Sequence, residues 1–327
     1  MLVQRKTFLS KFICAAVFAI QVPAVAAAPA YPTKPVRVIV PFAAGGGADV
    51  IARMVFAKVT EKLGKSFVID NRGGAGGITG TDAVAKAAPD GYTLLLGQTG
   101  PNAINPALFD KLPYDPIRDL APVTQLTSYP YVIVVNPSVP AKTLKELVAI
   151  AKQKPGSISF GTAGMGSSGQ LAAELLMRSA DIKMEHIPYK GAGPALVDTV
   201  GNVVSLTFGD AASATPLVNS GRLRALAVTG AHRSRLLPDV PTVAEGGYPG
   251  AQALAWHAVY APARTPVDII RKLNLELVAV LKDPEVREKL DKDGIEPVGS
   301  SPEAFGAYTR AEIKKWRDLV KAANIKL

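Results

Sequence analysis

The chain has 327 residues, enough for about two domains, and 48% of them are apolar, 20% charged and 6% aromatic. This composition is typical of a globular protein and excludes a disordered chain, a collagen and a polytopic membrane protein. The single cysteine, Cys14, lies within the first thirty residues. A disulfide framework, a thiolate metal cluster and a catalytic cysteine are therefore excluded from the mature chain.

The first thirty residues have the features of a secretory signal peptide. Three basic residues and no acidic one occur before residue 12, residues 12–20 are an unbroken apolar run, and residues 24–30 offer several cleavage frames between small residues. Gln21 and Pro23 end the apolar run well short of the ~20 residues of a membrane span, which argues against a transmembrane anchor. We expect residues 1–30 to be cleaved between about residues 26 and 30, and the mature protein to be periplasmic.

Removal of the signal peptide leaves 34 of the 37 basic residues against 27 acidic ones. The two signs are interspersed, without a block of like charges or an alternation of basic and aromatic residues, so nucleic-acid binding is not expected. A mildly basic surface favours encounters with small anions instead.

After residue 30, apolar strand-like runs alternate with amphipathic stretches. The run at 36–40 predicts a strand, residues 49–63 a helix with one apolar face, and residues 67–69 a second strand. Thr143 and Glu146 form a capping box at the start of a later helix. Further strands are expected at 93–96, 131–135, 157–160, 203–208, 223–228 and 258–260. This alternation predicts an α/β architecture with mostly parallel sheets.

Two irregular stretches rich in proline and glycine, 97–130 and 238–249, predict that the chain leaves one lobe and later returns to it. We expect residues 31–130 plus 251–327 to form the first lobe and residues 131–250 the second. This arrangement places a ligand cleft between the lobes.

Two glycine-rich turns each join a strand to a helix, at residues 41–49 (PFAAGGGAD) and 161–169 (GTAGMGSSG). Glycines let a ligand approach the backbone closely, and the N–H groups at a helix start carry about half a positive charge, so both turns suit an anion. The alternative for the first is a tight turn capped by Asp49. A third cluster, at 73–77, is either a structural turn or part of the cleft wall.

The second turn also matches a dinucleotide-binding fingerprint, because Gly164, Gly166 and Gly169 have the GxGxxG spacing between a strand and a helix. Export from the cytoplasm argues against a dinucleotide. The hydroxyl donors of Ser167 and Ser168 suit a small anion better.

Motifs for catalysis and metal binding are missing from the sequence. It contains no GxSxG elbow and no HExxH, and its histidines, His186, His232 and His257, are isolated. We expect these histidines to be packed or surface residues, and we expect no catalytic residue, metal or cofactor. Because a Ser-His-Asp set can be assembled from distant segments, a secreted hydrolase that uses Ser167 or Ser168 remains an alternative.

Five segments carry a resemblance to a known family. They are PFAAGGGAD (41–49), DNRGGAGG (70–77), APDGYTLL (88–95), HIPYKG (186–191) and LPDVPTVAE (237–245). In this order they resemble the Bug-type receptors of tripartite tricarboxylate transporters. The resemblance implies a two-lobed periplasmic binding protein of type II-like fold, each lobe a mixed, mostly parallel sheet flanked by helices. Such a receptor closes on a small carboxylate and delivers it to the permease subunits of the transporter in the membrane.

The resemblance also implies which residues hold the ligand. In the family, the two turns hold the carboxylate from opposite lobes, largely through backbone N–H groups and water. This sequence departs from the usual pattern at Gln170, where a histidine is common, and at Gly73, where a proline is common. The residues that the resemblance assigns to the ligand are Phe42, Ala43, Gly45, Gly46, Gly47, Asp49, Thr162, Gly164, Gly166, Ser167, Ser168 and Asp210.

Asp210 follows the predicted strand 203–208, where the family's cleft receives a third strand end. It would accept a hydrogen bond from an amino acid's ammonium group, and it would repel a plain dicarboxylate unless water intervened. We therefore expect a monomeric, non-enzymatic receptor for a dicarboxylate, a tricarboxylate, an aromatic acid or an acidic amino acid. The alternative role is a periplasmic sensor that presents the bound acid to a signalling partner in the membrane.

Overall fold

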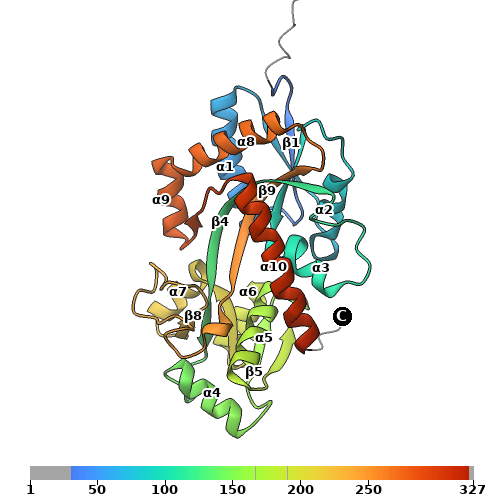
Figure 1. The fold of residues 1–327 in the computed structure, drawn as a ribbon. Coiled ribbons are helices and arrows are strands. Elements are labelled where there is room, and N and C mark those ends of the chain that lie inside the picture. The colour runs from blue at the N-terminus through green and yellow to red at the C-terminus, as the bar shows by residue number, and fades with distance from the viewer. Residues whose placement is uncertain (1–30, 166, 190, 324–327) are drawn as a thin grey trace, which may run out of the picture. The chain divides into compact units, whose positions relative to one another are not determined.

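Strands and helices alternate along the chain as the sequence predicts (Figure 1). The computed structural model describes residues 31–165, 167–189 and 191–323, so the predicted signal peptide lies outside the described residues. The strands are β1 (Val36–Val40), β2 (Phe67–Asn71), β3 (Thr93–Gln98), β4 (Leu120–Val135), β5 (Ser159–Thr162), β6 (Glu185–Pro188), β7 (Leu206–Asp210), β8 (Arg224–Val228), β9 (Leu254–Pro262) and β10 (Glu296–Pro297).

The helices lie between these strands and after the last of them. The α-helices are α1 (Gly47–Leu63), α2 (Ile78–Ala85), α3 (Asn105–Leu108), α4 (Leu144–Gln153), α5 (Ser168–Ala180), α6 (Ala192–Val200), α7 (Ala211–Asn219), α8 (Val267–Leu281), α9 (Pro284–Lys292) and α10 (Pro302–Ala323). Short helical turns are η1 (Ala75–Gly77), the π-helical η2 (Gly100–Ile104) and η3 (Pro249–Ala251).

The strands form a sheet in the order β2-β1-β3-β9-β4-β7-β5-β6, with β10 and β8 also paired to β4. Pairing is parallel among β1, β2 and β3 and among β5, β6 and β7, and antiparallel wherever β4 or β9 takes part. We call β1, β2, β3, β9 and β10, with residues 120–130 of β4, the first sheet. We call β5, β6, β7 and β8, with residues 131–135 of β4, the second sheet. The fold is the predicted mixed α/β class.

β4 belongs to both sheets. Its residues 120–130 pair with β9 and β10, and its residues 131–135 pair with β7 and β8. The prediction that the chain is irregular from 97 to 130 is wrong for 120–130. Two prolines in that stretch suggested a loop, but Pro122 lies at a register shift and Pro130 at the end of the β9 ladder, where a missing N–H donor is tolerated.

Local sequence signals explain where the helices begin and end. Half of the predicted capping box of α4 forms, because the hydroxyl of the N-cap Thr143 accepts from the Glu146 N–H. The Glu146 carboxylate accepts at 2.6 Å from the N–H of Lys142, the residue before the N-cap. Helix α1 ends at Gly64, which has φ 65° and closes the last turn on Thr60.

Helix α10 packs along the region where the two sheets meet (Figure 1). Trp256 of β9 lies edge-on to Phe305 of α10, with ring centroids 5.9 Å apart, and the Tyr260 hydroxyl hydrogen-bonds Thr309 of the same helix. α10 also contacts α5, which follows the second turn. The C-terminal helix therefore touches elements of both sheets.

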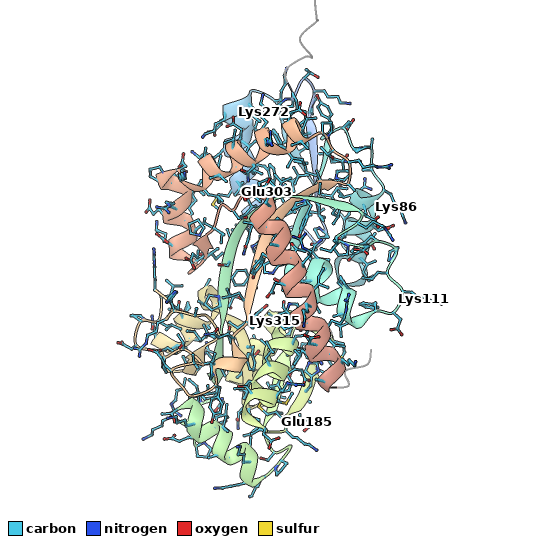
Figure 2. All side chains as sticks on the ribbon, in the orientation of Figure 1. Lys86, Lys111, Glu185, Lys272, Glu303 and Lys315 are labelled. Carbon is cyan, nitrogen blue, oxygen red and sulfur yellow. The ribbon has the colours of Figure 1, made fainter. Side chains whose placement is uncertain are left out.

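Charged side chains lie mainly on the outside of the ribbon, as the labelled Lys86, Lys111 and Glu303 show in Figure 2. None of the helices among the described residues is long and apolar enough to cross a membrane.

Candidate functional site

The first glycine-rich turn is exposed and lies between β1 and α1. Residues 43–47 are all exposed, whereas Ala48 and Asp49 in the first turn of α1 are buried. The first helical hydrogen bond runs from the Val50 N–H to the Gly46 carbonyl at 3.0 Å. The N–H groups of residues 47–49 precede that bond, and among the described residues they have no acceptor. This helix start therefore presents unpaired donors and the positive end of the helix dipole.

The buried Asp49 side chain holds the backbone of this turn through hydrogen bonds. Its Oδ2 atom accepts a hydrogen bond from the Gly45 N–H at 2.9 Å and from Arg53 Nε at 3.0 Å. Arg53 in turn donates to Asn71, whose amide donates to the Phe42 carbonyl at 3.1 Å. The hydrogen bond from Arg53 and that from the Gly45 N–H lower the pKa of Asp49 to about 2. The helix cap is Gly46 rather than Asp49, and Asp49 secures the loop that precedes it.

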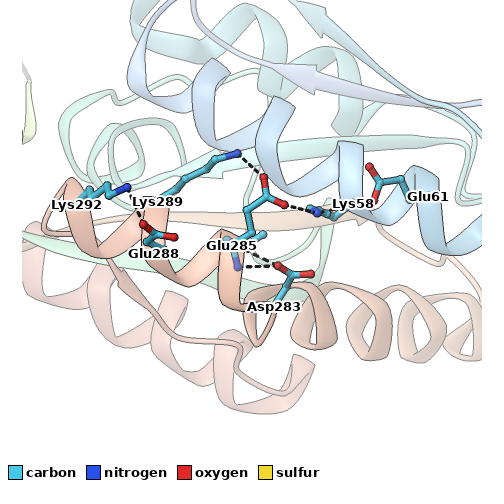
Figure 3. A network of polar contacts seen from close by, with 8 residues as sticks. Lys58, Glu61, Asp283, Glu285, Glu288, Lys289 and Lys292 are labelled. Carbon is cyan, nitrogen blue, oxygen red and sulfur yellow. Dashed lines mark hydrogen bonds and ion pairs between the residues drawn. The ribbon is translucent and has the colours of Figure 1, made fainter.

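Helix α1 is also tied to α9, as Figure 3 shows. Lys58 Nζ lies 2.7 Å from Glu285 Oε2, and Lys289 Nζ lies 2.9 Å from Glu285 Oε1. The hydrogen bond from Lys58, and then that from Lys289, lower the pKa of Glu285 to about 2. This bridge joins α1 to a helix more than two hundred residues later in the chain.

The third glycine cluster packs against the first turn. A Cβ atom on Gly73 would lie 3.4 Å from the Ala43 nitrogen, and one on Gly77 would lie 3.2 Å from the Phe42 ring. Gly77 also has φ 88°, which favours glycine. This cluster therefore supports the first turn from behind.

The second turn is built around the Thr162 hydroxyl, at the end of β5. This hydroxyl hydrogen-bonds the Gly164 carbonyl at 3.2 Å and His186 Nε2 at 2.6 Å, and Thr162 is 2% exposed. Gly164 has φ 132°, and a Cβ there would lie 3.2 Å from the Tyr189 carbonyl. Thr162 thus faces the protein interior, and Gly164 is required by the backbone.

Ser167 and Ser168 begin helix α5. Ser167 is the N-cap, and its hydroxyl accepts from the Gln170 N–H at 3.4 Å. Ser168 hydrogen-bonds the Tyr131 side chain, which lowers the pKa of that phenol, although burial has the larger effect and raises it to about 12. Gly166, which we predicted as a ligand residue, lies outside the described residues.

Asp210 ends β7 and caps α7. Its Oδ1 atom accepts from the Ser213 N–H at 2.8 Å. Tyr131 is its partner in the register between β4 and β7, and the negative charge of Asp210 adds to the raised pKa of Tyr131. Asp210 therefore lies beside the start of α5, because Tyr131 reaches both.

β4 relates the two turns to each other. At the carboxyl end of β3, Gln98 pairs with His257 of β9. His257 pairs in turn with Thr127 of β4. Tyr131, four residues further along β4, pairs with Asp210. The carboxyl ends of the parallel strands in both sheets, where ligands bind in α/β folds, therefore flank the central part of β4.

Sequence reasoning missed Gln98, Tyr129, Tyr131 and His257 as members of this region. Gln98 had a detectable signal, since it is a polar residue directly after an apolar strand. Tyr129 had none, because its place depends on β4 extending through residues 120–130. Tyr131 lies in the predicted strand 131–135, but its neighbours depend on the pairing of β4 with β7. His257 is packed, as predicted: burial lowers its pKa to about 4, and its Nδ1 atom lies 3.0 Å from the Thr127 hydroxyl.

Among the residues that the structure describes, no group of three or more His, Cys, Asp or Glu side chains could hold a metal ion. The exposed N–H groups at the start of α1 are instead suited to an anion that binds without a metal.

The fold and these two helix starts define a class, the two-sheet α/β solute-binding proteins. Residues 51–325 match the model of the Tripartite tricarboxylate transporter family receptor (TctC). The chain belongs to this family, and the predicted Bug-type resemblance is confirmed.

Several proteins with wide coverage are similar to this chain. Protein BugT of Bordetella pertussis is 39% identical over 298 residues, which cover 91% of each chain. An R. palustris protein solved with adipate is 37% identical, with a TM-score of 0.81, over 90% of this chain and 99% of that one. MatC of Rhodopseudomonas palustris, solved with bound malate, is 34% identical, with a TM-score of 0.77, over 89% of this chain and all of the other.

Proposed function

We propose that this chain is a periplasmic receptor that binds a small organic carboxylate between the starts of α1 and α5 and delivers it to the permease of a tripartite tricarboxylate transporter. The observation that carries the proposal is the exposed turn at 43–47, with unpaired N–H groups at the start of α1. Relatives solved with adipate and malate support a carboxylate as the ligand class.

Backbone donors can supply the required affinity. A hydrogen bond to a charged group contributes ~1.5–3 kcal/mol, so four or five of them can offset desolvation and closure and leave about 8 kcal/mol. That value corresponds to micromolar affinity, which also permits release to the permease. A positively charged side chain is not needed.

The proposed motion is a hinge closure of the two predicted lobes about the crossing strands. The chain passes between residues 31–130 plus 251–327 and residues 131–250 within β4, and again just before β9; β4 changes its partners between residues 130 and 131. The ligand favours the closed state because only that state lets both turns contact it.

We propose no catalytic role. Hydrolysis would require a serine paired with a base, but the Ser167 hydroxyl caps α5 and Ser168 pairs with Tyr131. Among the described residues, His186 and His257 hydrogen-bond threonines instead. A monomer suffices, because both turns come from one chain.

The experiment is calorimetry and thermal denaturation of the chain without residues 1–30. The panel contains adipate, malate, succinate, aspartate and citrate, and adipamide is the matched control because it has the adipate skeleton without charge. We expect at least one acid to bind with micromolar affinity and, at ~100 times its Kd, to add ~2.7 kcal/mol of stability, while adipamide has no effect. A flat response to every acid would contradict the proposal, and hydrolysis of an ester that depends on Ser167 or Ser168 would support the hydrolase instead.

A further inference from the structure

A groove outside the proposed ligand site lies between helix α10 and residues 106–118, which contain the end of α3 and the loop before β4. Helices α3 and α10 lie side by side in Figure 1, and the labelled Lys111 and Lys315 mark the loop and the helix in Figure 2. The groove has a volume of about 490 Å³ and opens to the surface. This volume lies in the range of sites that hold a small ligand or a few side chains of a partner.

The loop wall presents apolar side chains on an anchored backbone. Phe109 is 38% exposed and Ile117 is 45% exposed, and both line the groove. The Asp115 carboxylate accepts a hydrogen bond from the Ile117 N–H at 2.8 Å, and the Tyr114 hydroxyl donates to the Pro101 carbonyl at 2.7 Å. Because these bonds hold the loop, the two apolar side chains stay at the surface, where a partner can bury them.

The helix wall presents a row of cations. Arg310, Lys314 and Arg317 are spaced four and three residues apart, so they lie on one face of α10, and the buried Ile313 lies between them. Lys314 pairs with Asp318 at 2.5 Å. The guanidinium groups of Arg310 and Arg317 form no ion pair or hydrogen bond within the part of the chain that the structure describes.

The groove as a whole is positive. Four cationic side chains line it against two acidic ones, Asp110 and Asp115. The cation of the loop wall, Arg118, donates to both oxygens of Asp119, at 2.7 and 2.8 Å. The two free guanidinium groups of α10 are therefore the cations left for a partner. A guanidinium binds a carboxylate through two parallel hydrogen bonds, so the groove complements a molecule that combines carboxylates with an apolar group.

The shape of the groove favours a protein segment over a membrane surface. Its apolar and cationic groups face a common hollow, so the side chains of a segment can enter between them, whereas a flat bilayer would reach only the rim. Arginine and aromatic side chains are also enriched where proteins bind each other.

We propose that this groove binds an acidic periplasmic segment of the permease. Carboxylates of the segment pair with Arg310 and Arg317, and an apolar side chain packs between Phe109 and Ile117. This inference rests on the proposed function, because a receptor that delivers its ligand must contact the permease. It assigns the contact to a surface separate from the two ligand-binding turns.

The test is photo-crosslinking in cells that take up the tightest acid of the panel. Benzoylphenylalanine in place of Phe109 keeps an aromatic side chain in the groove and captures what binds there. We expect a covalent product with a permease subunit, at a periplasmic peptide that contains at least two acidic residues. Arg310→Glu combined with Arg317→Glu should reduce both this product and the uptake of the acid at least tenfold. Replacing the acidic residues of the captured peptide by arginine should restore both.

The purified double variant shows whether the effect belongs to the groove. Because both changes are at exposed positions, calorimetry should give a Kd for the acid within about twofold of wild type, and thermal denaturation an almost unchanged Tm. Matched controls are Arg222→Glu and Arg287→Glu, two exposed arginines whose guanidinium groups also lack an ion pair among the described residues. They should leave crosslinking, uptake and affinity unchanged.

Four results would overturn the inference. They are wild-type crosslinking and uptake in the double variant, loss of its affinity for the acid, capture of a second copy of the receptor instead of the permease, and binding to phosphatidylglycerol vesicles that depends on Arg310 and Arg317. In each case wild type still binds its acid and the proposed function stands. A wild type that binds no acid contradicts both.

Discussion

Replacing Gly46 by valine separates the binding role of the first turn from its role in the fold. Gly46 has φ −79° and ψ 166°, which a side chain tolerates, and a Cβ there would meet only the Ala43 carbonyl at 3.6 Å. The change should therefore alter the free energy of unfolding by no more than about 1 kcal/mol. The added side chain would stand over the N–H groups that start α1 and block the ligand's approach to them.

The expected loss of affinity follows from the hydrogen bonds removed. Two bonds to a charged carboxylate contribute ~3–6 kcal/mol, which corresponds to a 10²–10⁴-fold weaker Kd. Calorimetry with the tightest acid of the panel measures this loss, and urea denaturation checks the fold. Gly201→Val is the matched control, because a Cβ there also meets a backbone carbonyl at 3.6 Å but lies at the far end of α6. Unchanged affinity in Gly46→Val would refute the role of the turn.

The remaining predictions concern the supports of the two turns. Asp49→Asn should lower the free energy of unfolding by about 1–2 kcal/mol at neutral pH, because it removes the charge that Arg53 pairs with. Since the pKa of Asp49 in the native protein is lowered to about 2, the difference between wild type and variant should persist above pH 3.8 and disappear as the pH falls toward 2. Urea titrations at each pH measure this difference. Ser167→Ala should cost about 0.5 kcal/mol at the start of α5, since its capping bond is long, and a loss above 2 kcal/mol would show a larger structural role. Glu285 also has a lowered pKa, so its ion pair with Lys58 is present above pH 4.5 and lost toward pH 2. Lys58→Met should therefore reduce the dependence of the urea midpoint on pH in that range. The same pH dependence in the variant as in wild type would contradict the bridge in Figure 3.

The fold class and both turns could be predicted because their signals are local. Alternating apolar runs fix the strands, and the glycines of the first turn and the cap at Ser167 act within a few residues of their own helices. The role of Asp49 could not be predicted in full. Its side chain reaches back to Gly45 rather than capping the helix itself, and that choice depends on Arg53 and Asn71.

The neighbours of Gln98, Tyr131 and Asp210 could not be predicted, for a different reason. They depend on strand order and register, because β4 pairs Tyr131 with Asp210 and Thr127 with His257, residues that are 79 and 130 positions apart in sequence. Pro122 and Pro130 hid residues 120–130 of β4, and only its second part, 131–135, was predicted. Long-range pairing of this kind leaves no periodic signal in one sequence, so Tyr129, Tyr131 and His257 had no feature that pointed to the site.

The central claim is that backbone N–H groups at the starts of α1 and α5 bind the carboxylate. Selective ¹⁵N labelling of the 29 glycines tests it directly, because amide resonances report on those N–H groups. On saturation with an acid shown to bind by calorimetry, we expect the largest shifts at Gly46 and Gly47 in the first turn and at Gly169 in the second, with Gly201 unmoved. Saturation that leaves the glycines of both turns unshifted would contradict the account.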